Sequence, residues 1–169
     1  MEEQNIEVDE NDNIIGSRPR EEFYTGKNIH RSTYLILLNS KNEIIIQKRA
    51  STKKWYPNLY TFAVARTVQK GETYEESMEK GLKEKINISA PVKFLFKHRF
   101  YDKSDRAFRA VFICKSDEEI EPNKEDIAEV KWVNIDELEE DIKKHPERYA
   151  PPFIECMNKY FAEFYGAEK

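Results

Sequence analysis

The sequence has only two cysteines and no long run of apolar residues. Cys114 and Cys156 lie far apart and form no CxxC pair, which argues against a disulfide framework. No stretch approaches the run of about 18 apolar residues that a membrane-spanning helix needs. The first residues lack the basic and apolar regions of a secretory signal peptide. Together these absences predict a cytoplasmic protein with no membrane-spanning segment.

Neither sign of charge dominates the sequence. It has 28 basic and 32 acidic residues and a net charge of -4, which predicts neither a nucleic-acid platform nor an acidic tail. Charged residues make up 36% of the chain and hydrophobic residues 39%, so we expect a soluble protein with a highly charged surface. The length predicts a single domain over residues 1–169 with a core at about 6–164. The sequence leaves the oligomeric state open.

Strand-like and helix-like patterns alternate along the chain. The continuous apolar run at residues 34–38 is typical of a strand buried on both faces. Met78, Leu82 and Ile86 recur every four residues and predict an amphipathic helix after Gly71. Further strands are predicted at 6–8, 14–16, 43–49, 59–68, 92–96, 107–114 and 129–133, and further helices at 20–24, 135–142 and 153–164. The pattern predicts an α/β fold with a mixed sheet between helices.

The segment that begins at Glu72 combines carboxylates and lysines with this apolar stripe. Lys80, Leu82 and Glu84 follow Glu72 at spacings that resemble the Nudix box, the signature of the Nudix hydrolase superfamily. That signature runs Gly, five residues, Glu, seven residues, Arg-Glu, an aliphatic residue, one free position, Glu-Glu, one free position, Gly and an aliphatic residue. The resemblance implies that Glu72, Lys80 and Leu82 are structural positions of the box. It leaves Glu84 as the one carboxylate retained from the metal-binding cluster.

Several residues depart from this signature. Arg66 is at the place of the first glycine, and Gly81 and Lys85 are at the places of two metal-binding glutamates. In the family these glutamates lie on one helix face and bind divalent ions, which activate water for attack on a diphosphate. Glu84 alone is a weak candidate ligand, so we expect no high-affinity site. Mg²⁺ or Mn²⁺ is expected only if hydrolase activity is retained. Alternating lysines and glutamates are also typical of a solvated helix face.

Other segments resemble the Nudix branch that includes isopentenyl-diphosphate isomerase. They are residues 28–31, 46–49, 53–61, 71–72 and 129–133. This resemblance implies a Nudix α/β/α sandwich. Ala65 is at the place of the isomerase's catalytic cysteine and Thr67 at the place of one metal-binding histidine, so we do not expect isomerase activity. His30 matches another of those histidines, but alone we expect it to be a hydrogen-bonding structural residue.

The predicted site has few metal-binding residues but several basic ones. The isomerase resemblance implies that Arg49 and Lys53 contact a diphosphate, and Arg66 and Lys85 add two more cations. Arginine suits bidentate phosphate contact, and lysine supplies a point charge. We therefore predict these four side chains as a ligand-binding set. The alternative is that the basic residues around Arg49 form a solvated turn.

Two functions are consistent with these residues. The first is a binding module for a small phosphorylated ligand, a diphosphate or nucleotide, with weak or lost hydrolase activity. The alternative is an active Nudix hydrolase that cleaves a nucleoside diphosphate linked to another moiety, with an altered divalent-metal site. The small number of carboxylates in the box favours the binding module.

Overall fold

The apolar run at residues 34–38 lies inside β3 (Ile29–Leu38), the central strand of a mixed sheet. The computed structural model describes residues 3–166 of the chain. β3 runs parallel to β8 (Arg106–Lys115) and antiparallel to β6 (Val64–Thr67). The side chains of the apolar run are buried, as expected for a strand that is covered on both faces.

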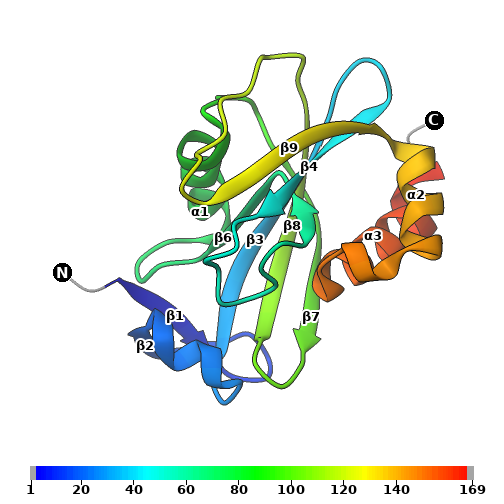
Figure 1. Cartoon of the computed structure of the whole chain (residues 1–169). Coiled ribbons are helices and arrows are strands. Elements are labelled where there is room, and N and C mark those ends of the chain that lie inside the picture. The colour runs from blue at the N-terminus through cyan, green and yellow to red at the C-terminus, as the bar shows by residue number, and fades with distance from the viewer. Residues whose placement is uncertain (1–2, 167–169) are drawn as a thin grey trace.

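Six more strands complete a sheet of nine strands (Figure 1). β7 pairs with β8, β4 pairs with both β5 and β9, and the hairpin of β1 and β2 pairs with β3 through β1. Their bounds are β1 (Gln4–Val8), β2 (Ile14–Pro19), β4 (Glu43–Arg49), β5 (Tyr60–Phe62), β7 (Lys93–Tyr101) and β9 (Ile127–Asn134).

Helices cover both faces of this sheet (Figure 1). On one face, α1 (Tyr74–Gly81) continues into the wider turn η2 (Leu82–Ile86). The other face is covered by α2 (Ile135–Lys144) and α3 (Pro151–Tyr160). Shorter helical segments are η1 (Arg20–Thr25), η3 (Pro146–Arg148) and η4 (Phe161–Tyr165). The arrangement confirms the predicted α/β/α sandwich with a mixed sheet. No helix within residues 3–166 is long and apolar enough to cross a membrane.

Helix α1 begins and packs as its sequence predicts. Thr73 and Glu76 form a reciprocal capping box at its start. Met78, Leu82 and Ile86 are buried against apolar side chains of β3 and β8. Burial of three such side chains contributes on the order of 5–9 kcal/mol before the entropy of ordering is subtracted. This packing fixes the position of the box relative to the sheet.

Several segment boundaries differ from the prediction; β3 begins earlier, at Ile29, and β7 continues to Tyr101. Residues 59–68 form two strands instead of one, because β5 pairs with β4 whereas β6 pairs with β3. The backbone bends at the buried Ala63, where the chain changes its pairing partner. The helix predicted at 153–164 begins earlier, at Pro151, since proline is well suited to the first turn. The bend at Ala63 brings β6, with Arg66, beneath the end of α1.

Gly81 is at a close approach of α1 to the sheet. A Cβ atom at this position would lie 2.6 Å from Cγ1 of Val64 and 3.4 Å from Cδ of Arg66. Val64 is fully buried and β-branched, so it has little freedom to move aside. Overpacking costs about 1–3 kcal/mol, and the helix-propensity gain of about 1 kcal/mol offsets part of this cost. We therefore predict that Gly81→Ala lowers the free energy of unfolding by up to about 2 kcal/mol.

Urea denaturation of Gly81→Ala and of Glu79→Ala, a control at an exposed position of the same helix, measures the effect. The control is expected to change stability by less than about 0.5 kcal/mol. Adding Val64→Ala to Gly81→Ala should remove the clash, so the two substitutions should couple favourably. A Gly81→Ala protein that is more stable than the original would contradict the close approach.

Candidate functional site

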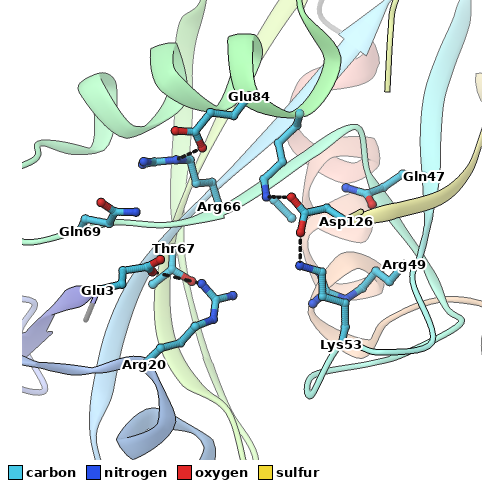
Figure 2. A pocket seen from close by; sticks show the side chains of 12 residues that line it. Glu3, Arg20, Gln47, Arg49, Lys53, Arg66, Thr67, Gln69, Glu84 and Asp126 are labelled. Atoms are coloured by element: carbon cyan, nitrogen blue, oxygen red, sulfur yellow. Dashed lines mark hydrogen bonds and ion pairs between the residues drawn. The ribbon is translucent and has the colours of Figure 1, made fainter. Parts of the chain in front are cut away.

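A pocket of about 80 Å³ opens where the end of α1, the strands β4 and β6 and the start of β9 meet (Figure 2). Its lining has five basic side chains and three carboxylates. We call this space the cation pocket; its lining residues are Glu3, Arg20, Gln47, Arg49, Lys53, Ala65, Arg66, Thr67, Gln69, Glu84, Lys85 and Asp126. The structure thus brings together the four predicted ligand-binding residues and the predicted metal candidate Glu84.

Arg66 is the most connected of these residues. Its buried guanidinium donates from Nη1 to Oε1 of Glu72 over 2.7 Å and to Oγ of Ser77 over 2.8 Å. Its Nε donates to Oε2 of Glu84 over 3.1 Å. Lys80, whose Nζ lies 2.7 Å from the other oxygen of Glu72, completes the group. Arg66 therefore ties β6 to both ends of the box, and its side chain lies next to Gly81.

Glu72 is ionised over a wide pH range because of these contacts. Burial alone raises the pKa of this carboxyl, but hydrogen bonds from Arg66 and Lys80 and from the backbone of Gln69 outweigh burial. The resulting pKa is about 2, against an ordinary value of 4.5. Lys80 is in an ion pair with Glu72, and Leu82, the third box-structural position, is buried in the core.

A second ion-pair group crosses the mouth of the cation pocket. Asp126, at the turn before β9, accepts from Nζ of Lys53 over 2.5 Å and from Nζ of Lys85 over 2.6 Å (Figure 2). Burial raises the pKa of Asp126, but the two lysines outweigh burial and hold the pKa at about 2. Lys53 and Lys85 come from separate segments of the chain, so Asp126 connects the loop after β4 to η2.

Arg49 differs from the other predicted cations in having no carboxylate partner within residues 3–166. Its Nε donates to the backbone oxygen of Trp55 over 2.8 Å. Burial lowers the pKa of Arg49, and the nearby charges of Arg20 and Arg109 act in the same direction. A buried charge is costly unless it is paired. Arg49 thus offers a partly desolvated positive charge to the pocket.

Behind the cation pocket lies a buried polar group centred on Asp105. Its Oδ1 lies 2.9 Å from Nε2 of His30, and its Oδ2 lies 2.5 Å from Nη2 of Arg109 and 3.0 Å from the hydroxyl of Tyr56. The ring of His30 stacks on Trp55 with centroids 4.6 Å apart. Burial lowers the pKa of His30, which favours the neutral imidazole. His30 is therefore engaged in a hydrogen bond and a ring stack.

The carboxylates at the site do not fit a magnesium or manganese cluster built from the protein. Within residues 3–166, no group of three or more His, Cys, Asp or Glu side chains could hold a metal ion. Glu72, Glu84 and Asp126 are each in an ion pair with a lysine or an arginine. A divalent ion would have to displace these cations, and Lys85 would repel it.

The sequence analysis did not identify Arg20, Arg109 or Asp126. Arg109 could have been identified from the sequence, because it is a charged residue within the apolar run at 107–114. A charged residue is rarely buried without a partner, so its position predicts a buried ion pair. Asp126 could not have been identified in this way, because it is one of many charged residues between β8 and β9. Arg20 lies on a separate short helix, η1, that only the folded chain places beside β4 and β6.

Known proteins match most of the chain. The NUDIX domain family model matches residues 28–155. The chain is 40% identical over 167 residues to the prenyl-diphosphate phosphatase of Methanosarcina mazei, and the match covers 96% of each chain. It is 27% identical to isopentenyl-diphosphate Delta-isomerase 2 of Photorhabdus laumondii, over 94% of this chain and 92% of that one.

Solved structures share the fold. The crystal structure of DR0079 from Deinococcus radiodurans superposes with a TM-score of 0.79 at 24% identity, over 93% of this chain and 98% of that one. The NUDIX domain of Shewanella oneidensis NrtR, whose structure contains ADP ribose, superposes with a TM-score of 0.62 at 12% identity, over 80% of this chain and 88% of that one. At these identities the likeness concerns the fold alone.

The ion pairs of Glu72 predict an acid-sensitive stability. The pKa of Glu72 in the folded protein, about 2, lies below its ordinary value of 4.5. Its contribution to stability is therefore complete above pH 4.5 and is lost as the pH falls toward 2. We predict that Glu72→Gln costs about 2–4 kcal/mol at neutral pH. The stability difference between the two proteins should shrink across this acidic window.

Chemical denaturation at a series of pH values tests this expectation. Glu79→Gln, which removes an exposed carboxylate from the same helix, is the control and should follow the original protein at every pH. A gap between Glu72→Gln and the original protein that stays constant down to pH 2 would show that Glu72 is not held by Arg66 and Lys80.

Proposed function

Because the chain belongs to the NUDIX domain family, we propose that it hydrolyses the diphosphate group of a prenyl diphosphate. The substrate class is suggested by the relative of 40% identity, named prenyl-diphosphate phosphatase, which matches over almost the full length of both chains. A prenyl diphosphate joins an apolar chain to a compact, strongly negative head. The head is the part that a small, basic pocket can recognise.

Arg49 is the observation that supports this proposal most directly. Its guanidinium lines the cation pocket, is partly buried and has no carboxylate partner within residues 3–166. A planar guanidinium matches two oxygens of one phosphate, and such charge-assisted pairs are about twice as strong as neutral hydrogen bonds. A diphosphate head would supply the negative charge that Arg49 lacks in the folded chain.

The remaining cations suit the charge that develops during hydrolysis. Five basic side chains face three carboxylates in the cation pocket, an excess of two positive charges. Positive groups fixed around the phosphoryl oxygens stabilise the transition state of attack by water. Arg66, Lys53 and Lys85 already hold Glu84 and Asp126, so phosphoryl oxygens compete with those carboxylates for the same donors.

The comparisons favour an active hydrolase over the binding module that the carboxylate count favoured. The relative with 40% identity is named a phosphatase. The argument from the carboxylate count assumes that only a metal ion can neutralise the charge of the diphosphate, whereas basic side chains can also do so. The proposed substrates are therefore prenyl diphosphates and not the nucleoside diphosphate derivatives that were expected from the sequence. Isomerisation is not proposed, since Ala65 offers neither an acid nor a base at the position of the isomerase's cysteine.

We predict phosphate release from dimethylallyl, geranyl and farnesyl diphosphates by the purified protein. Arg49→Gln should lower kcat/KM by about 100-fold, because it removes a charge-assisted contact worth about 1.5–3 kcal/mol. Lys48→Gln is the matched control. Lys48 precedes Arg49 on the same strand, but its ammonium lies 6.0 Å from the ring centroid of Tyr60, and it does not line the cation pocket. Its effect should be less than twofold.

Assays with and without added Mg²⁺ or Mn²⁺, and with a chelator, define the ion requirement of the same reaction. A protein that binds these compounds without releasing phosphate under any of these conditions would be a binding module. Turnover of nucleoside diphosphate derivatives alone would favour the other hydrolase hypothesis. Equal activity of Arg49→Gln and the original protein would show that Arg49 does not contact the substrate.

A further inference from the structure

A smaller cavity of about 30 Å³ adjoins the cation pocket. The two spaces share four lining residues, Arg20, Arg49, Ala65 and Thr67. We call the smaller space the inner cavity. Its own lining includes Tyr34, Tyr56 and Arg109, which bring it close to the buried group around Asp105.

Arg109 is the unusual member of this lining. It is only 3% exposed, and its Nη2 donates to Asp105. Its Nε and Nη1 have no hydrogen-bond partner within residues 3–166. A buried donor without a partner costs about 1–3 kcal/mol, so native proteins normally provide an acceptor. Two such donors on one guanidinium that borders a cavity indicate that an acceptor binds there.

Among the described residues, no carboxylate lines the inner cavity. Asp105 already has His30 at one oxygen and both Arg109 and Tyr56 at the other. Burial raises the pKa of Tyr34 to about 12, so its hydroxyl is protonated at neutral pH and available as a donor. The inner cavity also has three arginines, Arg20, Arg49 and Arg109, in its lining. This combination suits a negatively charged group that only accepts hydrogen bonds.

The size of the inner cavity restricts that group further. At about 30 Å³ the inner cavity admits only a compact group and excludes a prenyl chain. The end of a diphosphate is a phosphoryl group whose outer oxygens all accept hydrogen bonds. Arg49 borders both spaces and can contact the head on either side of their junction.

We propose that the inner cavity is an oxyanion subsite for the terminal phosphoryl group of the substrate, with Arg109 and Arg49 as its donors. This subsite rests on the proposed function for its substrate, since it assigns one end of the diphosphate head to one part of the site. The inner phosphate of the head, which carries the ester bond to the chain, then lies in the cation pocket.

Binding of pyrophosphate in the presence of a chelator tests the subsite without any turnover. Arg109→Lys keeps the positive charge beside Asp105 but removes the fork of N–H donors. It should weaken the Kd measured by calorimetry about tenfold or more, while the thermal midpoint shows that the variant is folded. Arg106→Lys makes the same change on the same strand, outside both spaces and over the ring of Tyr101, and should leave the Kd within twofold.

Tyr34→Phe is a second variant in case Arg109→Lys does not fold. It removes only the hydroxyl and should weaken pyrophosphate binding several-fold. Crystals soaked in tungstate, a heavy analogue of phosphate, should show anomalous density within hydrogen-bond distance of Nε or Nη1 of Arg109. Tungstate only beside Arg66 and Lys85, with water at Arg109, would overturn the subsite, as would unchanged pyrophosphate binding by folded variants.

The outcomes separate the two proposals. Hydrolysis of prenyl diphosphates together with a water-filled inner cavity overturns the subsite and leaves the proposed function intact. Tungstate and pyrophosphate bound at Arg109, without hydrolysis of any prenyl diphosphate, support the anion subsite and overturn the proposed function.

Discussion

The site depends on the hydrogen bonds made by the buried guanidinium of Arg66. The guanidinium joins β6 to α1 through Glu72 and Ser77 and reaches Glu84 at the far end of the box. Gly81 lies against both Val64 and Arg66: a Cβ atom there would lie 2.6 Å from Cγ1 of Val64 and 3.4 Å from Cδ of Arg66. The small residue and the large one are complementary. Compared with the Nudix signature, side-chain bulk has moved from the helix to the strand beneath it, since Gly81 replaces a glutamate and Arg66 replaces a glycine.

Local patterns were sufficient to predict most of the fold. The apolar run of β3 and the four-residue spacing of Met78, Leu82 and Ile86 each record burial directly, so the strand and the helix could be located from the sequence. The break at Ala63 could not, because it depends on which strands β5 and β6 choose as partners. Pairing of distant strands is a property of the whole sheet and leaves little trace in the local sequence.

The site was predictable where residues align with a known signature and unpredictable where distant segments supply the partners. The four expected cations do line one pocket. What the sequence could not supply is their charge balance: Asp126 is in ion pairs with two of them, and Arg49 has no carboxylate partner within residues 3–166. Counting carboxylates in the box therefore gave an incomplete account of the electrostatics. Those depend on η1, on the loop after β4 and on the turn before β9.

The position of Asp126 between Lys53 and Lys85 has a consequence for selectivity. The carboxylate is an internal competitor, present at a fixed and very high effective concentration beside the two ammonium groups. A monovalent anion such as chloride or acetate offers no more than Asp126 does and gains little by replacing it. A ligand with several charged oxygens can engage both lysines and Arg49 at once, and so repays the displacement. The ion pair thus favours anions with several charged oxygens over monovalent ones.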